Sequence, residues 1–194
     1  YSMTAATTDP LTDLEPAIAG MLEKSLAWRA QPPYMIQSLP DVQQSLQAFL
    51  GAAPSLVQPR VENLKRLGGG ASKEQFVFDL LQSGSGPTRC VLRMDPLESA
   101  VTTSREREYA ILDVMQNVIP VPKPLWADYT GDKLGRPALI TNFIQGVTKP
   151  SNSNSNVSGF GTVFDQPTRE RLSVPFIKHF AAMHAVDWRS TSHN

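Results

Sequence analysis

Cysteine, histidine and net charge are all scarce in this sequence. Its 194 residues include one cysteine, Cys90, and three histidines, and 18 basic residues balance 18 acidic residues to a net charge of zero. A single cysteine excludes an internal disulfide framework, and the lack of Cys or His pairs at ligand spacing argues against structural zinc. A neutral chain is not expected to bind nucleic acid or a membrane surface through charge. The cysteine usage favours a reducing, cytoplasmic location.

Long hydrophobic runs are missing as well. No apolar segment approaches the roughly 20 residues that a membrane-spanning helix needs. The first residues, Tyr1-Ser2-Met3, lack the basic-then-apolar order of a signal peptide. The hydrophobic share of 41% is nevertheless ordinary for a globular protein. We therefore expect one domain, or one domain and part of a second, with a well-formed core.

Hydrophobic periodicity divides the chain into three parts. Residues 1–59 are typical of a helical extension, with one helix after Asp13 and a second from Asp41 to Gly51. Residues 60–146 contain five segments with strand signals, separated by glycine and proline turns. These segments are 61–67, 75–80, 89–94, 125–129 and 138–144. The first three are expected to form an antiparallel meander within a five-stranded antiparallel sheet.

One helix is expected between the third and fourth strands. It runs from about Ser104 to Asn117, and Thr103 and Glu106 fit a capping box at its start. Its apolar face, which is expected to pack on the sheet, consists of Ile111, Leu112 and Met115. Strands and helices in this order predict an α+β fold.

Residues 147–194 differ in composition from the rest. Seven of the eight residues from 151 to 158 are Ser or Asn, which is typical of a solvated loop. An amphipathic helix is expected over residues 168–187. Its His184 has apolar neighbours and is expected to be packed, and Cys90 in the third strand is expected to be a small core residue.

Glycine is concentrated between the first two strands, in Gly68-Gly69-Gly70-Ala71-Ser72. Successive glycine N–H groups can surround an anion, and Ser72 adds a hydroxyl. The segment is no P-loop, because no Gly-Lys-Ser/Thr follows, and the alternation after it argues against the helix of a Rossmann loop. A glycine-rich hairpin over nucleotide phosphates, as in kinases, is one interpretation, and a plain flexible turn is the other.

Two charged residues follow this segment in an order that favours the first interpretation. In kinases a cation on the third strand holds the nucleotide phosphates and pairs with a glutamate on the next helix. Here Arg93 ends the third strand, and Glu108 lies on the helix face expected to point towards the sheet. Each residue alone is more simply a solvated charge. Their order predicts an Arg93–Glu108 ion pair.

Seven short stretches are informative as an ordered set. They are Leu67–Ser72, Val91–Pro96, Arg107–Leu112, Val121–Leu125, Leu134–Pro137, Asn142–Gly146 and Met183–Trp188. The set, which covers about residues 41–188, resembles the aminoglycoside phosphotransferase-like branch of the protein-kinase fold. That branch includes choline-kinase-type and acyl-CoA-dehydrogenase-associated kinase domains.

The resemblance implies a protein-kinase-like N-lobe at residues 60–146, with a nucleotide hinge. Residues 147–194 would be the start of a helical C-lobe. By the resemblance, Gly69, Gly70 and Ser72 would lie in the nucleotide-positioning loop. Arg93 would be the phosphate-holding cation and Glu108 its partner. Thr141 would be the gatekeeper, and the backbone of Asn142, Phe143 and Ile144 would be the hinge that binds the adenine edge.

The sequence departs from the family pattern in two ways. Arg93 stands where the antibiotic kinases have lysine, and Lys73-Glu74 follow Ser72 where asparagine is common. The family's His-Gly-Asp catalytic loop and later metal-binding Asp belong to the second lobe, and none of the three histidines precedes Gly-Asp or Arg-Asp. We therefore expect no catalytic residue and no metal ligand in this chain, and place the ligands of Mg²⁺ beyond residue 194.

The expected function is that of an ATP-dependent phosphotransferase acting on the hydroxyl of a small molecule, with this chain alone inactive. The alternatives are a pseudo-kinase or nucleotide-binding interaction module of a larger polypeptide, and an α+β structural domain whose glycine turn binds nothing. The acceptor class and the choice of ATP or GTP stay open. The apolar face of the helix over 168–187 is expected to promote self-association or to bind a partner chain.

Overall fold

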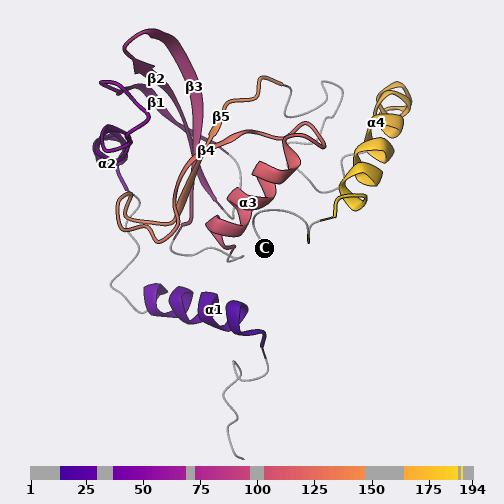
Figure 1. The fold of residues 1–194 in the computed structure, drawn as a ribbon, viewed down its shortest axis with the longest axis horizontal. Helices are drawn as coiled ribbons and strands as arrows, with labels where there is room; N and C mark the ends of the chain where they lie inside the picture. The colour runs from indigo at the N-terminus through magenta and orange to yellow at the C-terminus, as the bar shows by residue number, and fades with distance from the viewer. Residues whose placement is uncertain are drawn as a thin grey trace, which may run out of the picture.

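The computed structural model describes residues 14–29, 37–68, 73–96, 103–146, 164–187 and 189. Within these ranges two helices precede three strands, and a helix, two strands and a final helix follow (Figure 1). The helices are α1 (Pro16–Arg29), α2 (Leu39–Gly51), α3 (Arg105–Met115) and α4 (Gln166–His184). The strands are β1 (Arg60–Leu67), β2 (Glu74–Gln82), β3 (Ser85–Met94), β4 (Pro124–Asp128) and β5 (Ala138–Asn142).

The strands, labelled in Figure 1, form one antiparallel sheet in the spatial order β1-β2-β3-β5-β4. β1, β2 and β3 are the predicted meander, and the turn between β2 and β3 uses Gly84 at a φ of 83°, which a residue with a side chain rarely adopts. β5 lies between β3 and β4, so the segment containing α3 crosses from the centre of the sheet to its edge. The predictions of an α+β fold and of a five-stranded antiparallel sheet are confirmed.

The hydrophobic core lies on one face of the sheet, and α2 covers it. Alternate residues of the central strands point to this face, and three buried residues of α2 pack on them. They are Val42, Leu46 and Leu50 from α2, Phe76, Phe78 and Leu80 from β2, Cys90, Leu92 and Met94 from β3, and Ala138 and Ile140 from β5. Burial of each large apolar side chain contributes roughly 1.5–3 kcal/mol. The second helix of the expected extension is therefore part of the core, and the expectation for Cys90 is confirmed.

Side-chain hydrogen bonds hold α2 on the sheet. Ser38 caps the helix, its Oγ accepting from the N–H of Asp41 at 3.3 Å. The Gln47 amide then binds the backbone at the start of β1, accepting from Val61 N–H at 2.8 Å and donating to the Pro59 carbonyl at 2.8 Å. Because β1 is an edge strand, these bonds satisfy backbone groups that would otherwise face solvent.

α3 lies on the opposite side of the sheet from α2 (Figure 1) and contacts β4 and β5. Its cap is Ser104, whose Oγ accepts from the N–H of Arg107 at 3.2 Å. The predicted capping box of Thr103 and Glu106 is therefore wrong by one position. Either hydroxyl could serve as the cap, and the helix begins one residue later than expected. Ile111, expected to pack on the sheet, is 60% exposed.

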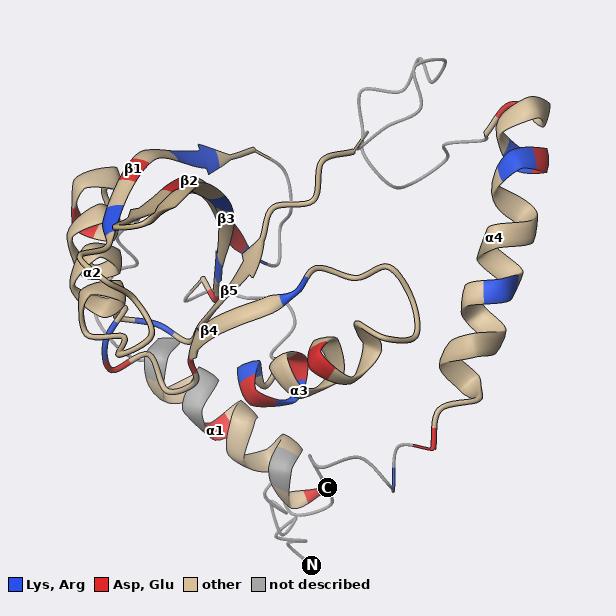
Figure 2. Ribbon diagram, turned by 45° about the horizontal axis from the view of Figure 1, so that its top comes forward, with Lys and Arg blue, Asp and Glu red and all other residues tan. Residues whose placement is uncertain are grey.

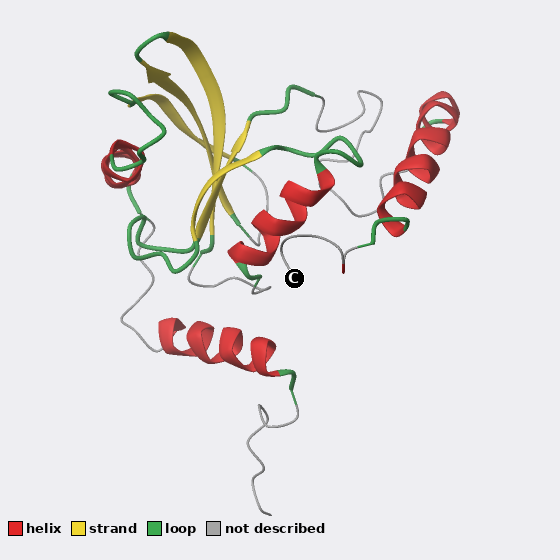
Figure 3. Cartoon of the chain, in the orientation of Figure 1, coloured by secondary structure: helices red, strands yellow, loops and turns green. Residues whose placement is uncertain are grey.

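α4 is exposed on all sides. None of its described residues is buried, and Figures 1 and 3 place it apart from the sheet. Asp165 caps the helix by accepting from Thr168 N–H at 2.9 Å. The expectation that His184 is packed is wrong, because its ring is exposed and meets only Phe180 among the described aromatic side chains, at 4.4 Å between centroids. None of the described helices has the length and apolarity needed to cross a bilayer.

Candidate functional site

The side chain of Arg93 leaves β3 on the face of the sheet opposite to the core. Strand residues alternate between faces, and Leu92 and Met94 are buried under α2. Arg93 lies across from Gln75 on β2 and Leu139 on β5, which therefore share its face. One face of β3 thus builds the core, and the other presents a cation towards α3.

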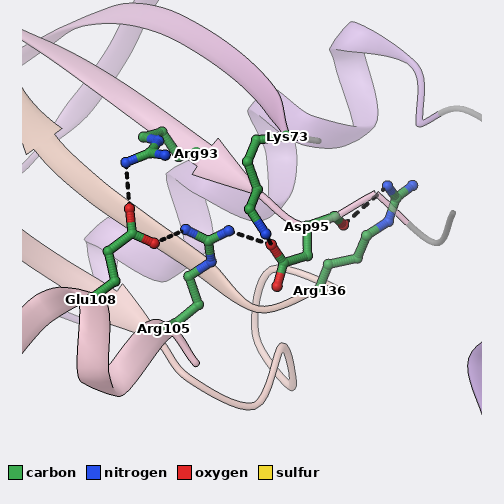
Figure 4. Close-up of polar contacts among 6 residues, drawn as sticks. All are labelled: Lys73, Arg93, Asp95, Arg105, Glu108 and Arg136. Atoms are coloured by element: carbon green, nitrogen blue, oxygen red, sulfur yellow. Dashed lines mark hydrogen bonds and ion pairs between the residues drawn. The ribbon is translucent and has the colours of Figure 1, made fainter. Parts of the chain in front are cut away.

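Arg93 forms the predicted ion pair with Glu108 of α3, between Nη1 and Oε1 (Figure 4). The side chains are 32% and 20% exposed. Pairs in such partly exposed surroundings contribute only about 0 to 1 kcal/mol to stability. The pair is therefore better suited to orienting a guanidinium than to holding the fold together. Its formation confirms the predicted contact, and its role in binding stays a prediction.

A second arginine holds the other oxygen of Glu108. Arg105, the first residue of α3, donates from Nη1 to Glu108 Oε2 and from Nη2 to Asp95 Oδ1. Its side chain is fully buried, at 0% exposure. Glu108 thus lies between two guanidinium groups, with one oxygen on each (Figure 4).

Asp95, the residue that follows β3, makes further contacts. Its Oδ1 also accepts from Lys73 Nζ at 2.5 Å, and Arg136 Nη1 lies 3.5 Å from its backbone carbonyl and 3.6 Å from Glu74 Oε1. Burial lowers the pKa of Lys73, while its hydrogen bond to Asp95 opposes that change.

Five side chains therefore form one connected series: Lys73, Asp95, Arg105, Glu108 and Arg93. We refer to this set as the charge chain. It contains three cations and two carboxylates. Figure 4 shows how it joins the residue before β2, the end of β3 and the first turn of α3.

A cavity of about 740 Å³ opens beside the charge chain. The two terminal residues of the charge chain, Lys73 and Arg93, line this cavity together with Glu108. Thr103, Ser104 and Arg107 also line it, and four apolar side chains complete the wall. These are Ile18 and Met21 from α1 and Ile111 and Leu112 from α3. The exposed side chain of Ile111 therefore lines the cavity and does not pack on the sheet.

The other predicted site residues are not all placed beside this cavity. Gly69, Gly70 and Ser72 lie outside the described residues. Thr141 is buried on the same face of the sheet as Val91, its partner across β3 and β5. The segment from Asn142 to Ile144 leaves β5 and does not line the cavity.

The predicted hinge is fixed by backbone hydrogen bonds. Asn142 N–H donates to the Lys123 carbonyl at 3.1 Å, and its Oδ1 accepts from Lys123 N–H at 2.6 Å. Phe143 N–H donates to the Arg89 carbonyl at 2.9 Å. Ile144 follows with an exposed side chain.

The chain has a distant likeness to a solved structure. No family model matches the sequence, and no curated protein matches it. Among solved structures, the chain is similar to a proposed aminoglycoside phosphotransferase from Ralstonia eutropha JMP134, with 22% identity and a TM-score of 0.49. The similarity covers 76% of this chain and 39% of that protein. The chain therefore spans well under half the length of that protein.

Sequence reasoning missed Asp95 and Arg105 as members of the site and noted Lys73 only as a departure from a family pattern. One local signal was available, because Arg105 and Glu108 are three apart on a helix and so share a face. A second was that Asp95 follows Arg93 by two residues, the period of a strand. Neither signal indicates that the two carboxylates share one arginine, which depends on how α3 packs.

Proposed function

We propose that this chain is the nucleotide-binding part of an ATP-dependent phosphotransferase that acts on the hydroxyl of a small molecule. The observation that carries the proposal is the Arg93–Glu108 pair, formed between a third strand and the next helix. Kinases use a strand cation and a helix glutamate in this relation to hold nucleotide phosphates. The positions of Lys73 and Arg93 on the wall of the same cavity support this role.

The proposed phosphate site combines groups from three segments. Arg93 supplies a guanidinium, which binds phosphate oxygens through two parallel hydrogen bonds. Lys73 supplies an ammonium group on the same cavity. Gly69, Gly70 and Ser72, directly before Lys73 in the sequence, would add backbone N–H groups and a hydroxyl.

The adenine would bind along the segment after β5. The N–H groups of Asn142 and Phe143 already donate to carbonyls within the chain, so we propose that the adenine edge is bound by the backbone of Ile144. Thr141 would stand beneath the base on the face shared with Val91. This arrangement leaves the exposed side chain of Ile144 free to point away from the ligand.

The chemistry of transfer needs more than these residues. Phosphoryl transfer requires a carboxylate that orients the acceptor hydroxyl and dedicated ligands for Mg²⁺. In the described part of the chain no three His, Cys, Asp or Glu residues come together as a metal site. We propose that the chain binds ATP and does not turn it over.

Titration of the 194-residue chain with ATP, in the presence and absence of Mg²⁺, tests the proposal. Arg93→Met should weaken binding about tenfold, because a charge-assisted hydrogen bond to phosphate is lost. Its melting temperature should be nearly that of the wild type. Arg66→Met is the matched control: Arg66 also pairs with a glutamate, Glu74, its side chain is also 32% exposed, and it lies on the core face of β1 across from Phe76.

Three results would count against parts of this proposal. Equal ATP affinity of the Arg93→Met and wild-type chains would remove the assigned role of Arg93. Absence of any ATP-induced thermal shift in the wild type would favour a structural domain that binds no nucleotide. Acceptor-dependent release of ADP by this chain would show that it contains its own catalytic carboxylate. Binding without turnover in a longer native polypeptide would instead favour the pseudo-kinase alternative.

A further inference from the structure

We propose that Arg105 is a positioning residue that holds Glu108, and through it Arg93, in the orientation that binds phosphate. This inference rests on the proposed function. It concerns a residue that would not touch the nucleotide, because Arg105 is fully buried and does not line the cavity. Arg105 would act through the oxygen of Glu108 that Arg93 leaves unbound.

The geometry of Arg105 suits this role. Its two terminal nitrogens reach two different carboxylates, Nη1 to Glu108 and Nη2 to Asp95. A guanidinium is planar and keeps its nitrogens in a fixed fork, so contact with one carboxylate fixes the direction of contact with the other. A lysine at this position could hold one carboxylate but would not orient both.

The position of Arg105 in the chain extends its effect beyond one side chain. Arg105 is the first residue of α3, and Asp95 follows the last residue of β3. Lys73, which binds the same Asp95 oxygen, precedes β2 and follows the glycine-rich segment. The first turn of α3, the end of β3 and the start of β2 are thereby held together at one buried carboxylate.

Glu108 would be less restricted without this contact. Its side chain is partly exposed, and the pair with Arg93 alone lies where solvent weakens ionic attraction. Loss of Arg105 would leave one Glu108 oxygen and one Asp95 oxygen each without one of their cations. Glu108 would then adopt several rotamers, and Arg93 would spend less time pointing at the phosphates.

A double-mutant cycle for ATP affinity separates positioning from simple stabilisation. Arg105→Met should weaken ATP binding about tenfold in the folded chain, the loss expected for one charge-assisted hydrogen bond. In the Arg93→Met background the same change should weaken binding less than about twofold, because Arg105 acts through Arg93. Arg105→Lys should recover part of the affinity.

Arg136→Met is the matched control for buried charge. Arg136 is also a buried arginine at Asp95, but its contacts given for the described residues are to the Asp95 backbone carbonyl and to Glu74. Both methionine variants should melt at lower temperature, whereas only Arg105→Met should alter ATP affinity. If Arg105→Met does not fold, Arg105→Lys is compared with Arg136→Lys in the same way.

Hydrogen exchange of the α3 amides, residues 105–115, gives a readout that needs no nucleotide. Faster exchange in Arg105→Met than in Arg136→Met supports the inference, and equal exchange overturns it. Wild-type ATP affinity in folded Arg105→Met also overturns it and leaves the proposed function standing. If Arg105→Met still weakens ATP binding tenfold in the Arg93→Met background, the inference is also overturned and the proposed function stands. A wild-type chain that binds no ATP overturns the proposed function, and exchange alone then decides whether Arg105 fixes α3.

Discussion

Cys90 illustrates how burial controls the chemistry of a single side chain. Its thiol is fully buried in the core, and burial raises its pKa from 9.0 to about 11. The thiolate is the reactive form, so almost none is present near neutral pH. We expect iodoacetamide to label Cys90 in the native chain far more slowly than in urea. Mass spectrometry of alkylated protein measures both rates, and similar rates would mean that the strand opens freely.

The same shift predicts a loss of stability in alkali. Between about pH 9 and pH 11 the unfolded thiol, with its ordinary pKa of 9.0, has largely lost its proton while the folded thiol keeps it. The folded state then binds more protons, so the free energy of unfolding falls as pH rises through this window. Cys90→Ala removes this contribution, and urea melts of the two chains should converge towards pH 11. If the unfolding free energies of the two chains changed with pH in the same way, the pH dependence could not be assigned to Cys90.

Asp128 organises the loop between β4 and β5. Its buried carboxylate accepts from three backbone N–H groups, those of Gly131 at 3.0 Å, Lys133 at 2.8 Å and Leu134 at 2.7 Å. Replacement by alanine leaves these donors without their partner. We expect Asp128→Ala to lower the free energy of unfolding by about 3 kcal/mol, measured by urea denaturation.

Asp132 in the same loop is the control for Asp128. Its exposed carboxylate accepts only from Thr130 Oγ1 among the described contacts, at 2.6 Å. Asp132→Ala should change stability by less than about 0.5 kcal/mol. Equal losses for the two variants would mean that charge, and not the three backbone bonds, determines the effect.

Among the elements, α2 is the helix whose membership of the sheet domain can be measured. Leu46 is completely buried between α2 and the sheet, whereas Leu26 of α1 is exposed. Leu46→Ala should cost about 2–5 kcal/mol of unfolding free energy, since it removes buried surface and leaves a cavity. Leu26→Ala should cost under about 0.5 kcal/mol. Thermal or urea denaturation gives both values, and a small loss at Leu46 would place α2 outside the cooperative unit.

The elements that could be predicted from the sequence are those with local signals. Alternating residues such as Phe76 and Phe78 indicated β2, and Arg93 was predicted to end the third strand. Glu108 then followed from its place on the next helix. The cap of α3 was displaced by one residue because Thr103 and Ser104 are equally good caps, and sequence cannot choose between them.

The rest of the site depends on tertiary packing. Asp95 and Arg105 lie at the ends of elements, where charged residues are usually solvated. Only the approach of α3 to the end of β3 buries them together. The prediction that Ile111 packs on the sheet was wrong for a related reason. Helical periodicity shows which residues share a face of the helix, but it does not show which element that face contacts.

For the whole molecule, the feature with the clearest consequence is the exposed apolar surface of α4. Phe176 and Phe180 are 69% and 51% exposed and stack on each other with ring centroids 6.2 Å apart. Figure 2 shows few charged residues along this helix. We expect the chain to self-associate through α4, seen as a sedimentation coefficient that rises with concentration.

Polar replacement on α4 tests this expectation. The double variant Phe176→Gln/Phe180→Gln should remain monomeric, with a melting temperature close to that of the wild type, because neither ring packs in the core. Lys178→Gln is the control on the same helix and should leave association unchanged. Persistent association of the double variant would assign the contact to another surface.

The two faces of β3 have different roles, and this restricts where codons can be inserted into or deleted from the gene. Cys90 and Leu92 enter the core, while Val91 and Arg93 face α3. Insertion or deletion of one codon within this strand would exchange the two sets, sending the guanidinium into the core and the thiol towards the ligand. The same change at Ser83-Gly84, in the turn before β3, would leave both sets in place. Length variation among functional descendants of this sequence should therefore occur at that turn and not within the strand.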